Sequence, residues 1–397
     1  MLNLSQYIHL NTFTDLAIMI FCAMAAGRLV KKIRLPNVTG YLIAGFVIGP
    51  SVLGLLSENF LDSISIISDC ALGFIAFSIG SEFKISYFKR VGIAPIVIAI
   101  MESFFAVALV AAVLIPVTGN VRFSFVLSSI AAATAPAATI MVIKQYKAKG
   151  PVTETLLSVV ALDDATALIM YSIMTAAAGV LAGKTSSIKE LALPPVIEIF
   201  GGIAAGALLG FIFILPLKFF KKDGNRTALT VAFVFLGLGI SEIFGFSSLL
   251  LCMALGSVLT NLSSDSDKIM NLTDNITPPV FILFFTASGA ALNIKVLPTV
   301  GIAGAIYIIM RVAGKIFGAY LGAVISKADK NIKKYLGPAL VPQAGVAIGL
   351  SLLAGRAFPE FAQQIRAIIL CGTLIYELAG PGIAKMSLKA AGEIKEN

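Results

Sequence analysis

Two adjacent carboxylates, Asp163 and Asp164, stand in the middle of a long apolar run between Val159 and Thr166. Placing a charged side chain at membrane depth costs about 2.5–3.5 kcal/mol, so such residues mark ion or proton pathways. Neighbouring residues of a helix point about 100° apart, so one carboxylate can face a cavity while the other faces a neighbouring helix. Because the two repel each other, they are expected to titrate as a coupled set. Their oxygens can bind a hard monovalent cation or, in its place, protons.

Two positive charges, Arg311 and Lys315, lie one helical turn apart inside another apolar run. The i, i+4 spacing puts both on one face of a helix. Buried cations need partners, and the intramembrane acids that can supply them are Glu102 and the aspartate pair. Both cations could instead reach the membrane surface along their aliphatic stems, which their mid-span positions disfavour. The aspartates could equally be a structural pair that is neutralised by Lys or Arg.

Other ionisable residues also fall within apolar runs, at Asp69, Glu198, Glu242 and Glu377. Glu198 and Glu242 lie near the ends of their runs, where a carboxylate can simply reach the membrane interface. The sequence therefore favours the aspartate pair as the chemical centre.

Prolines interrupt two further apolar runs near their centres. Pro136 stands within 133–139, and Pro338 and Pro342 stand within 337–345. A proline inside a helix removes one backbone hydrogen bond and clashes with the carbonyl four residues back. Broken backbone at membrane depth is tolerated only beside protein or a cavity. Either proline segment alone could be a mere kink, but paired breaks at matched positions are typical of the ion sites of transporters.

The composition excludes a soluble domain. The chain has 397 residues, of which 58% are hydrophobic and 13% charged, and its mean hydropathy is +0.95. Ordinary globular chains are about 25% charged. Continuous apolar blocks of roughly 20 residues predict transmembrane helices, whereas spanning strands would alternate polar and apolar residues. We therefore predict an all-α integral membrane protein.

Cysteine and histidine usage argues against metal or redox chemistry. Cys22, Cys70, Cys252 and Cys371 are far apart in separate apolar blocks, and His9 is the only histidine. Such isolated cysteines are typical packing residues. No nucleophile–base set or metal motif is evident, so we expect no enzymatic activity and no cofactor.

About thirteen transmembrane spans are predicted from the apolar blocks and the breaks between them. They cover residues 13–30, 38–56, 61–81, 91–117, 121–143, 152–182, 194–217, 227–243, 246–262, 277–293, 298–325, 332–354 and 362–387. No basic segment precedes the first span as in a cleavable signal peptide, so we take it as a retained helix.

The basic residues support this set of spans. Of the 30 Lys and Arg residues, 22 fall on one side of the membrane and 6 on the other, and the remaining two are Arg311 and Lys315. An excess of this kind marks the cytoplasmic side. The prediction is a multi-pass protein of the cell inner membrane with its N-terminus outside and its C-terminus in the cytoplasm. The net charge of +9 then reflects topology rather than nucleic-acid binding.

The spans can be arranged as two repeats, residues 1–182 and 227–390, joined by a linker helix within 183–226. The fifth span of each repeat is the broken one, and the fourth spans carry Glu102 and the Arg311/Lys315 pair. An offset of seven spans, an odd number, inverts one repeat relative to the other in the bilayer. The repeat is topological, since no residue-level repeat is evident.

Several motifs together resemble the bacterial monovalent cation/proton antiporters, in the branch of the Nap-type sodium exchangers and the membrane domain of the Kef-type potassium systems. The resemblance covers nearly the whole chain. The motifs that carry it are Leu-Pro-Asn-Val-Thr-Gly-Tyr-Leu at 35–42, Ala-Thr-Ala-Pro-Ala-Ala-Thr at 133–139, Lys-Ala-Lys-Gly-Pro at 147–151, Val-Ala-Leu-Asp-Asp at 160–164, Arg-x-x-x-Lys-x-x-Gly at 311–318 and Pro-Gln-Ala-Gly-Val-Ala at 342–347.

The resemblance implies a six-helix core, about 91–182 and 298–387, which contains two crossed discontinuous helices and slides like an elevator against a dimerisation domain. It implies Asp164 as the main cation and proton carrier, Asp163 as the partner of Lys315, and Thr134 as a ligand. Pro136, Thr139 and Gln343 would support the site on the broken helices. Glu102–Arg311 is our further guess for a structural salt bridge. Members of this family with two acids at these positions are usually electrogenic, and those with Asn at the first position are usually electroneutral. Because this sequence has both acids, the resemblance implies electrogenic exchange, and it also implies a homodimer.

The resulting hypothesis is an antiporter that exchanges one Na⁺ or Li⁺ for two protons. Three alternatives stay open at this point: a K⁺/H⁺ antiporter, a sodium-coupled organic solute symporter, and a membrane sensor or scaffold that transports nothing. The full Kef-type systems carry a cytoplasmic nucleotide-binding domain that this sequence lacks, which disfavours ligand-gated potassium efflux.

Overall fold

The computed structural model describes residues 11–32, 37–81, 83–86, 92–135, 139, 142–143, 146–181, 196–292, 297–343 and 345–394. Within these residues the regular structure is helical throughout. Seven helices are long and apolar enough to cross a membrane, and six shorter apolar helices accompany them. Each of these helices overlaps one of the predicted spans, which confirms the predicted all-α membrane fold.

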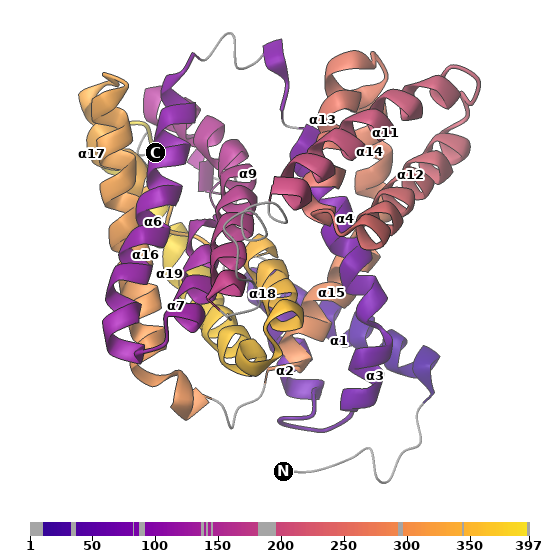
Figure 1. Cartoon of the computed structure of the whole chain (residues 1–397), viewed down its shortest axis with the longest axis horizontal. Helices are drawn as coiled ribbons and strands as arrows, with labels where there is room; N and C mark the ends of the chain where they lie inside the picture. Colours follow the sequence, from indigo (N-terminus) through magenta and orange to yellow (C-terminus); the bar gives the residue numbers. More distant parts are fainter. Residues whose placement is uncertain are drawn as a thin grey trace.

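The helices form two groups that lie side by side in Figure 1. The first, which we call the site group, contains α6 (Ala94–Thr118), α7 (Val121–Ser129) with η2 (Ile130–Ala132), α9 (Pro151–Val180), α16 (Leu297–Ile325), α17 (Lys330–Ala339), α18 (Gly345–Ala357), η5 (Pro359–Phe361) and α19 (Ala362–Ala390). The second, the framework group, contains α1 (Thr12–Lys32), α2 (Asn37–Ile48), α3 (Glu58–Ser63), α4 (Ser65–Ser81), η3 (Ile197–Gly201), α11 (Gly202–Leu217), α12 (Asp223–Phe244), α13 (Ser248–Leu262), α14 (Ser266–Ile276) and α15 (Pro278–Ala290).

Both predicted helix breaks lie in the site group, and they meet. The helical chain of α7 and η2 ends at Ala132, after which Ala133 is extended. On the other side α17 ends at Ala339 and α18 begins at Gly345. The backbone N–H of Ala135 donates to the carbonyl of Pro342 at 2.9 Å, so the two breaks cross.

Two details differ from the predicted spans, and one predicted break residue is not described. Pro338 was placed in a break but lies inside α17, one residue before its end, so the break begins only after it. Pro136 lies outside the described residues. The predicted loop 263–275 instead contains the amphipathic helix α14, which buries Ile269 and Thr273 against the framework group.

Glycines allow α16 to lie directly against α6. Gly314, Gly318 and Gly322 recur every four residues on one face of α16. A Cβ atom at these positions would come within 2.6, 2.5 and 2.7 Å of the backbone of α6. Small residues at this spacing let transmembrane helices pack backbone to backbone. The close approach brings the residues of α16 between these glycines against α6 at Glu102.

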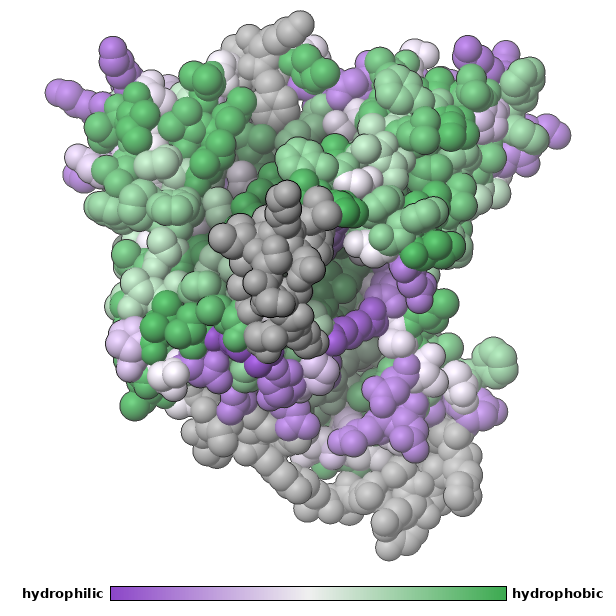
Figure 2. Space-filling view, viewed as in Figure 1, coloured by the Kyte–Doolittle hydropathy of each residue, from purple (hydrophilic) through white to green (hydrophobic). Residues whose placement is uncertain are grey.

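The surface agrees with a membrane location. Figure 2 shows hydrophobic side chains over the outer flanks of both groups, while hydrophilic ones gather at the upper corners and in a lower band. Large apolar side chains such as Phe21, Leu208 and Phe211 are more than half exposed. Apolar exposure on this scale suits contact with lipid, because a water-soluble monomer rarely exposes large apolar patches.

Replacement of Gly318 by Leu should destabilise the protein by about 1–3 kcal/mol or more, because the added side chain meets the backbone of α6. The measurement is the thermal unfolding midpoint of the purified protein in detergent. Gly239→Leu is the matched control, since a Cβ at this helical glycine meets nothing within 4 Å. Equal midpoints for the two variants would contradict the close packing of α16 on α6.

Candidate functional site

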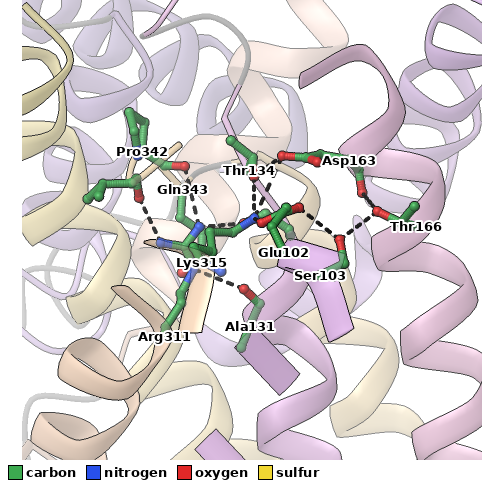
Figure 3. A network of polar contacts seen from close by, with 12 residues as sticks. Glu102, Ser103, Ala131, Thr134, Asp163, Thr166, Arg311, Lys315, Pro342 and Gln343 are labelled. Atoms are coloured by element: carbon green, nitrogen blue, oxygen red, sulfur yellow. Dashed lines mark hydrogen bonds and ion pairs between the residues drawn. The ribbon is translucent and has the colours of Figure 1, made fainter. Parts of the chain in front are cut away.

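Asp163 lies at the centre of a buried polar network beside the first helix break (Figure 3). Its side chain is 0% exposed. The hydroxyl of Thr134, which lies in the non-helical backbone just after η2, donates to Oδ2 of Asp163 at 2.6 Å. The ammonium of Lys315 is 3.7 Å from the same oxygen. Asp163 and the interrupted helix are therefore in direct contact, as predicted.

Lys315 connects three elements of the site group. Its ammonium donates to Oε2 of Glu102 on α6 and, at 2.8 Å, to the hydroxyl of Thr134. Both Lys315 and Glu102 are fully buried. Thr134 thus accepts a hydrogen bond from the lysine and donates one to Asp163. Thr134 therefore bridges the ammonium of Lys315 and the carboxylate of Asp163, which are themselves 3.7 Å apart.

The expected salt bridge between Glu102 and Arg311 is wrong. Glu102 pairs with Lys315, and Arg311 lies one turn away on α16 and turns toward the helix breaks. The reason is the glycine packing, because Gly314 and Gly318 flank Lys315 and press this turn of α16 against Glu102. The pairing of Lys315 with Asp163 is present, but as the longer of the two ion pairs of the lysine.

Arg311 binds backbone carbonyls of both broken helices. Its guanidinium donates to the carbonyls of Ala131 at 3.1 Å and Ala133 at 2.6 Å, and to those of Val341 at 2.7 Å and Pro342 at 3.4 Å. The last carbonyls of a helix have no partner within the helix and carry partial negative charge. One buried cation therefore neutralises the ends of two half-helices.

Aromatic and amide groups complete the support of the crossing. The Arg311 guanidinium lies 4.5 Å from the centroid of the Tyr376 ring, a cation–π contact. Gln343 donates to the carbonyl of Ile130 at 3.1 Å and to the hydroxyl of Tyr307 at 2.9 Å. These bonds tie the second break to the start of η2 and to α16, so the crossing is held by side chains as well as by backbone.

The other predicted supporting residue, Thr139, donates to the carbonyl of Ala339 at the longer distance of 3.4 Å. It thereby links the residues after the first break to the end of α17. Its contact is with backbone, and the described contacts of Thr139 do not include the carboxylates.

Asp164 follows Asp163 on α9 and is also buried, with 4% of its surface exposed. Its side chain points about 100° around the helix from that of Asp163. Within the described residues, no three acidic, histidine or cysteine side chains converge as they would around a tightly held metal ion. A transported cation would therefore need hydroxyl, backbone or water oxygens in addition to the aspartates.

One oxygen of Asp163 is available for a proton or a cation. Among the described residues no donor reaches its Oδ1, although the atom is buried. A buried acceptor without a partner costs about 1–3 kcal/mol, and more when it is charged. A proton or a cation bound to this oxygen would remove this cost.

Two residues of the network were not predicted. Ser103 donates to Oε1 of Glu102 at 2.9 Å and lies 2.6 Å from the hydroxyl of Thr166, which in turn donates to the carbonyl of Asp163 at 3.0 Å. The only available signal was their position, since Ser103 follows one intramembrane acid and Thr166 lies three residues after another. These hydroxyls connect α6 to α9 behind the two carboxylates.

Comparisons with known proteins identify the family and the fold. The family described as the transmembrane sodium/hydrogen exchanger matches residues 16–386. The high-affinity Na⁺/H⁺ antiporter NhaS3 of Synechocystis is 21% identical over 91% of this chain and 87% of its own length. The structure of the sodium proton antiporter MjNhaP1 from Methanocaldococcus jannaschii at pH 8 superposes with a TM-score of 0.80 at 18% identity, covering 96% of this chain and 99% of the other. An electron microscopy structure of MjNhaP1 gives 0.76, also at 18% identity, over 97% and 99%.

Removal of one partner of the buried Glu102–Lys315 pair should be strongly destabilising. Glu102→Ala leaves the ammonium of Lys315 buried with one partner fewer, and losses of about 3–5 kcal/mol are typical in such cases. The double variant Glu102→Ala/Lys315→Met should regain part of this loss, because no uncompensated charge remains. Thermal unfolding midpoints of the purified proteins measure both effects.

The exposed pair of Lys84 and Asp267, 2.7 Å apart, is the control for this comparison. Its side chains are 42% and 78% exposed, so Asp267→Asn should change stability by less than about 1 kcal/mol. A double variant no more stable than Glu102→Ala would contradict the proposed role of the pair.

Proposed function

Because this chain belongs to the sodium/hydrogen exchanger family, we propose that it exchanges Na⁺ for protons, with Asp164 and Asp163 as the groups that bind both. One observation carries the assignment to these residues. A buried aspartate with an unpartnered oxygen lies beside the crossing of two broken helices, with a lysine 3.7 Å away. Carboxylate oxygens suit a hard cation and bind protons equally well, and both cannot occupy one oxygen at once.

The charges of the site provide the coupling in this proposal. Glu102, Asp163 and Asp164 contribute three negative charges, and Lys315 and Arg311 contribute two positive ones, so the empty site carries a net charge of −1. One Na⁺ or one proton neutralises it. A neutral site crosses a low-dielectric barrier more readily than a charged one. Each loaded form carries one negative charge fewer than the empty form from which it arises and therefore moves more readily, which links the two ion fluxes.

An exchange of two protons for one Na⁺ needs a second proton site. Lys315 supplies it in our proposal, because Na⁺ bound near Asp163 weakens the ion pair and the desolvated ammonium then releases its proton. Na⁺ entering the site would thus displace one proton from an aspartate and one from the lysine, which leaves the Na⁺-loaded site one unit more negative than the proton-loaded site. Such a cycle moves net charge and is electrogenic.

We further propose that the site group moves as a body against the framework group, so that the site opens to each side of the membrane in turn. The crossing of the breaks supports this idea, because a backbone bond and Arg311 join α16 and both broken helices into one unit beside the aspartates. Side chains also bridge the two groups. Arg356 on α18 pairs with Asp69 on α4 at 2.6 Å, and Thr39 on α2 donates to Glu377 on α19.

Replacement of Asp164 by Asn should abolish Na⁺-dependent proton release in proteoliposomes. The amide keeps the volume of the side chain, but it does not take up a proton at the pH of the assay and does not carry the negative charge that attracts the cation. Glu154→Gln is the control, since Glu154 is an exposed acid on the same helix. Retained exchange in Asp164→Asn would end the assignment. The same assay with Li⁺ and K⁺, at clamped membrane potential, separates a sodium from a potassium antiporter and tests electrogenicity.

Cross-linking of the two helix groups should stop exchange if they move relative to each other. In a variant without the native cysteines, Asp69→Cys and Arg356→Cys are joined by a short bifunctional thiol reagent. We expect exchange to fall at least about tenfold and to recover when a cleavable linker is reduced, because the joined groups must separate during motion.

Two further ion pairs provide matched controls for this experiment. Arg122 and Glu360, 2.8 Å apart, lie within the site group, and Lys84 and Asp267 lie within the framework group. Cysteine pairs at these positions should cross-link without loss of exchange. Full activity of the cross-linked Asp69/Arg356 pair would exclude relative motion of the groups at this point.

A further inference from the structure

A cavity separates α9 of the site group from the framework group. It has a volume of about 320 Å³ and lies between α9, α18 and the beginnings of η3 and α13. Hydroxyl groups and one carboxylate line much of it. These polar lining residues are Tyr171, Ser172, Thr175, Glu198, Ser247 and Ser248.

The wall that α9 contributes continues the helix face of Asp164. Leu168, Tyr171, Ser172 and Thr175 follow Asp164 by four, seven, eight and eleven residues. Residues at these spacings lie on one side of a helix. Leu168, which is buried, is the first lining residue beyond Asp164. The cavity therefore runs along α9 toward the aspartate and ends about one helical turn from it.

Glu198 places a carboxyl group in this cavity without a cationic partner in the described part of the chain. It lies in the single π-helical turn η3, and its backbone carbonyl accepts a hydrogen bond from the N–H of Ser247 at 3.1 Å. No described Lys or Arg comes within ion-pair distance of its carboxylate, and its surface is only partly exposed. A partly buried carboxylate is stabilised by a bound cation when no side chain neutralises it.

The hydroxyls around Glu198 offer the oxygen ligands that hard cations prefer. The hydroxyl of Thr175 is an example of an oxygen whose lone pairs are free to bind a cation. Its hydroxyl donates its proton to the carbonyl of Tyr171 at 2.7 Å, which leaves the oxygen lone pairs as acceptors. Ser172 and Ser247 add two more hydroxyl oxygens to the lining. One full negative charge with several neutral oxygens is a donor set for a monovalent cation.

We propose that Glu198 and these hydroxyls form a second cation site, which binds Na⁺ before it reaches Asp164. The inference rests on the proposed function and names a waiting position for its substrate. The site lies at the end of α9 and the beginning of η3, the side predicted to face outward. A negative charge in a low-dielectric cleft raises the local concentration of cations. Glu198 therefore acts by recruiting Na⁺ and not by carrying it across.

The first test compares Glu198→Gln with Glu242→Gln in Na⁺-driven exchange. Glu242 is an exposed acid on α12 that is predicted to face the same side and lines none of the cavities described. We expect Glu198→Gln to raise the half-saturating Na⁺ concentration about threefold or more, with little change in the maximal rate, since only recruitment is lost. Glu242→Gln should leave both unchanged. An unchanged half-saturating concentration in Glu198→Gln would overturn the proposal.

The second test measures Na⁺ binding without transport. Thr175→Cys, in the variant without native cysteines and in lipid nanodiscs, is treated with a charged methanethiosulfonate reagent. The thiol should react, and Na⁺ should slow its reaction more than choline at equal ionic strength. In the Glu198→Gln background this protection should disappear. Ile173→Cys, on another face of α9 and 48% exposed, should not react, because it faces lipid.

The two outcomes separate this inference from the proposed function. If Asp164→Asn still exchanges Na⁺ for protons, the assignment of the aspartates fails whatever the thiol result. If Asp164→Asn is inactive but Na⁺ does not protect Thr175→Cys, or protects it equally without Glu198, only the second cation site is excluded.

Discussion

The site at the centre of this protein depends on one requirement: backbone carbonyls at the interrupted helix ends must find hydrogen-bond donors inside the membrane. Two helices are interrupted within the apolar interior, and the groups exposed at their ends cannot turn to water. Arg311 meets this need by donating to carbonyls of both η2 and the segment after α17. The direct backbone bond from Ala135 to Pro342 joins the same ends. Without these donors the interruption would be too costly to keep, and no polar site could exist at this depth.

Because the guanidinium of Arg311 donates to backbone carbonyls, Lys315 is the cation that balances the charge of the buried acids. Its ammonium contacts Glu102, Thr134 and Asp163 at once, so a change at one partner can shift the ammonium toward another. Arginine suits the first role because its planar guanidinium offers five donors and keeps its charge, whereas lysine can lose its proton when desolvated. The two cations of one helix face therefore serve different ends, one structural and one proposed to be chemical.

Much of the fold could be predicted because membrane spans follow from composition and length alone. The thirteen apolar blocks and the two broken segments were readable from apolar runs and prolines, whereas the place of Thr134 beside Asp163 was implied by the family resemblance. The pairing of Glu102 was not, because it depends on which turn of α16 the glycines press against α6. Ser103 and Thr166 escaped notice for a related reason: an isolated hydroxyl in an apolar run has no periodic signal. Helix α14 was missed because its polar sequence resembles a loop until its buried face is known.

The crossing of the breaks also bears on biogenesis. Ala131, Ala133 and Ala135 lie in the half of the chain that a ribosome makes first, whereas Arg311 and Pro342 lie in the half made last. During synthesis the early half waits in the bilayer with its interrupted helix unsupported. Assembly of the two halves is therefore interdependent, and a nascent chain truncated before Arg311 should be a substrate for membrane quality control rather than a stable half-protein.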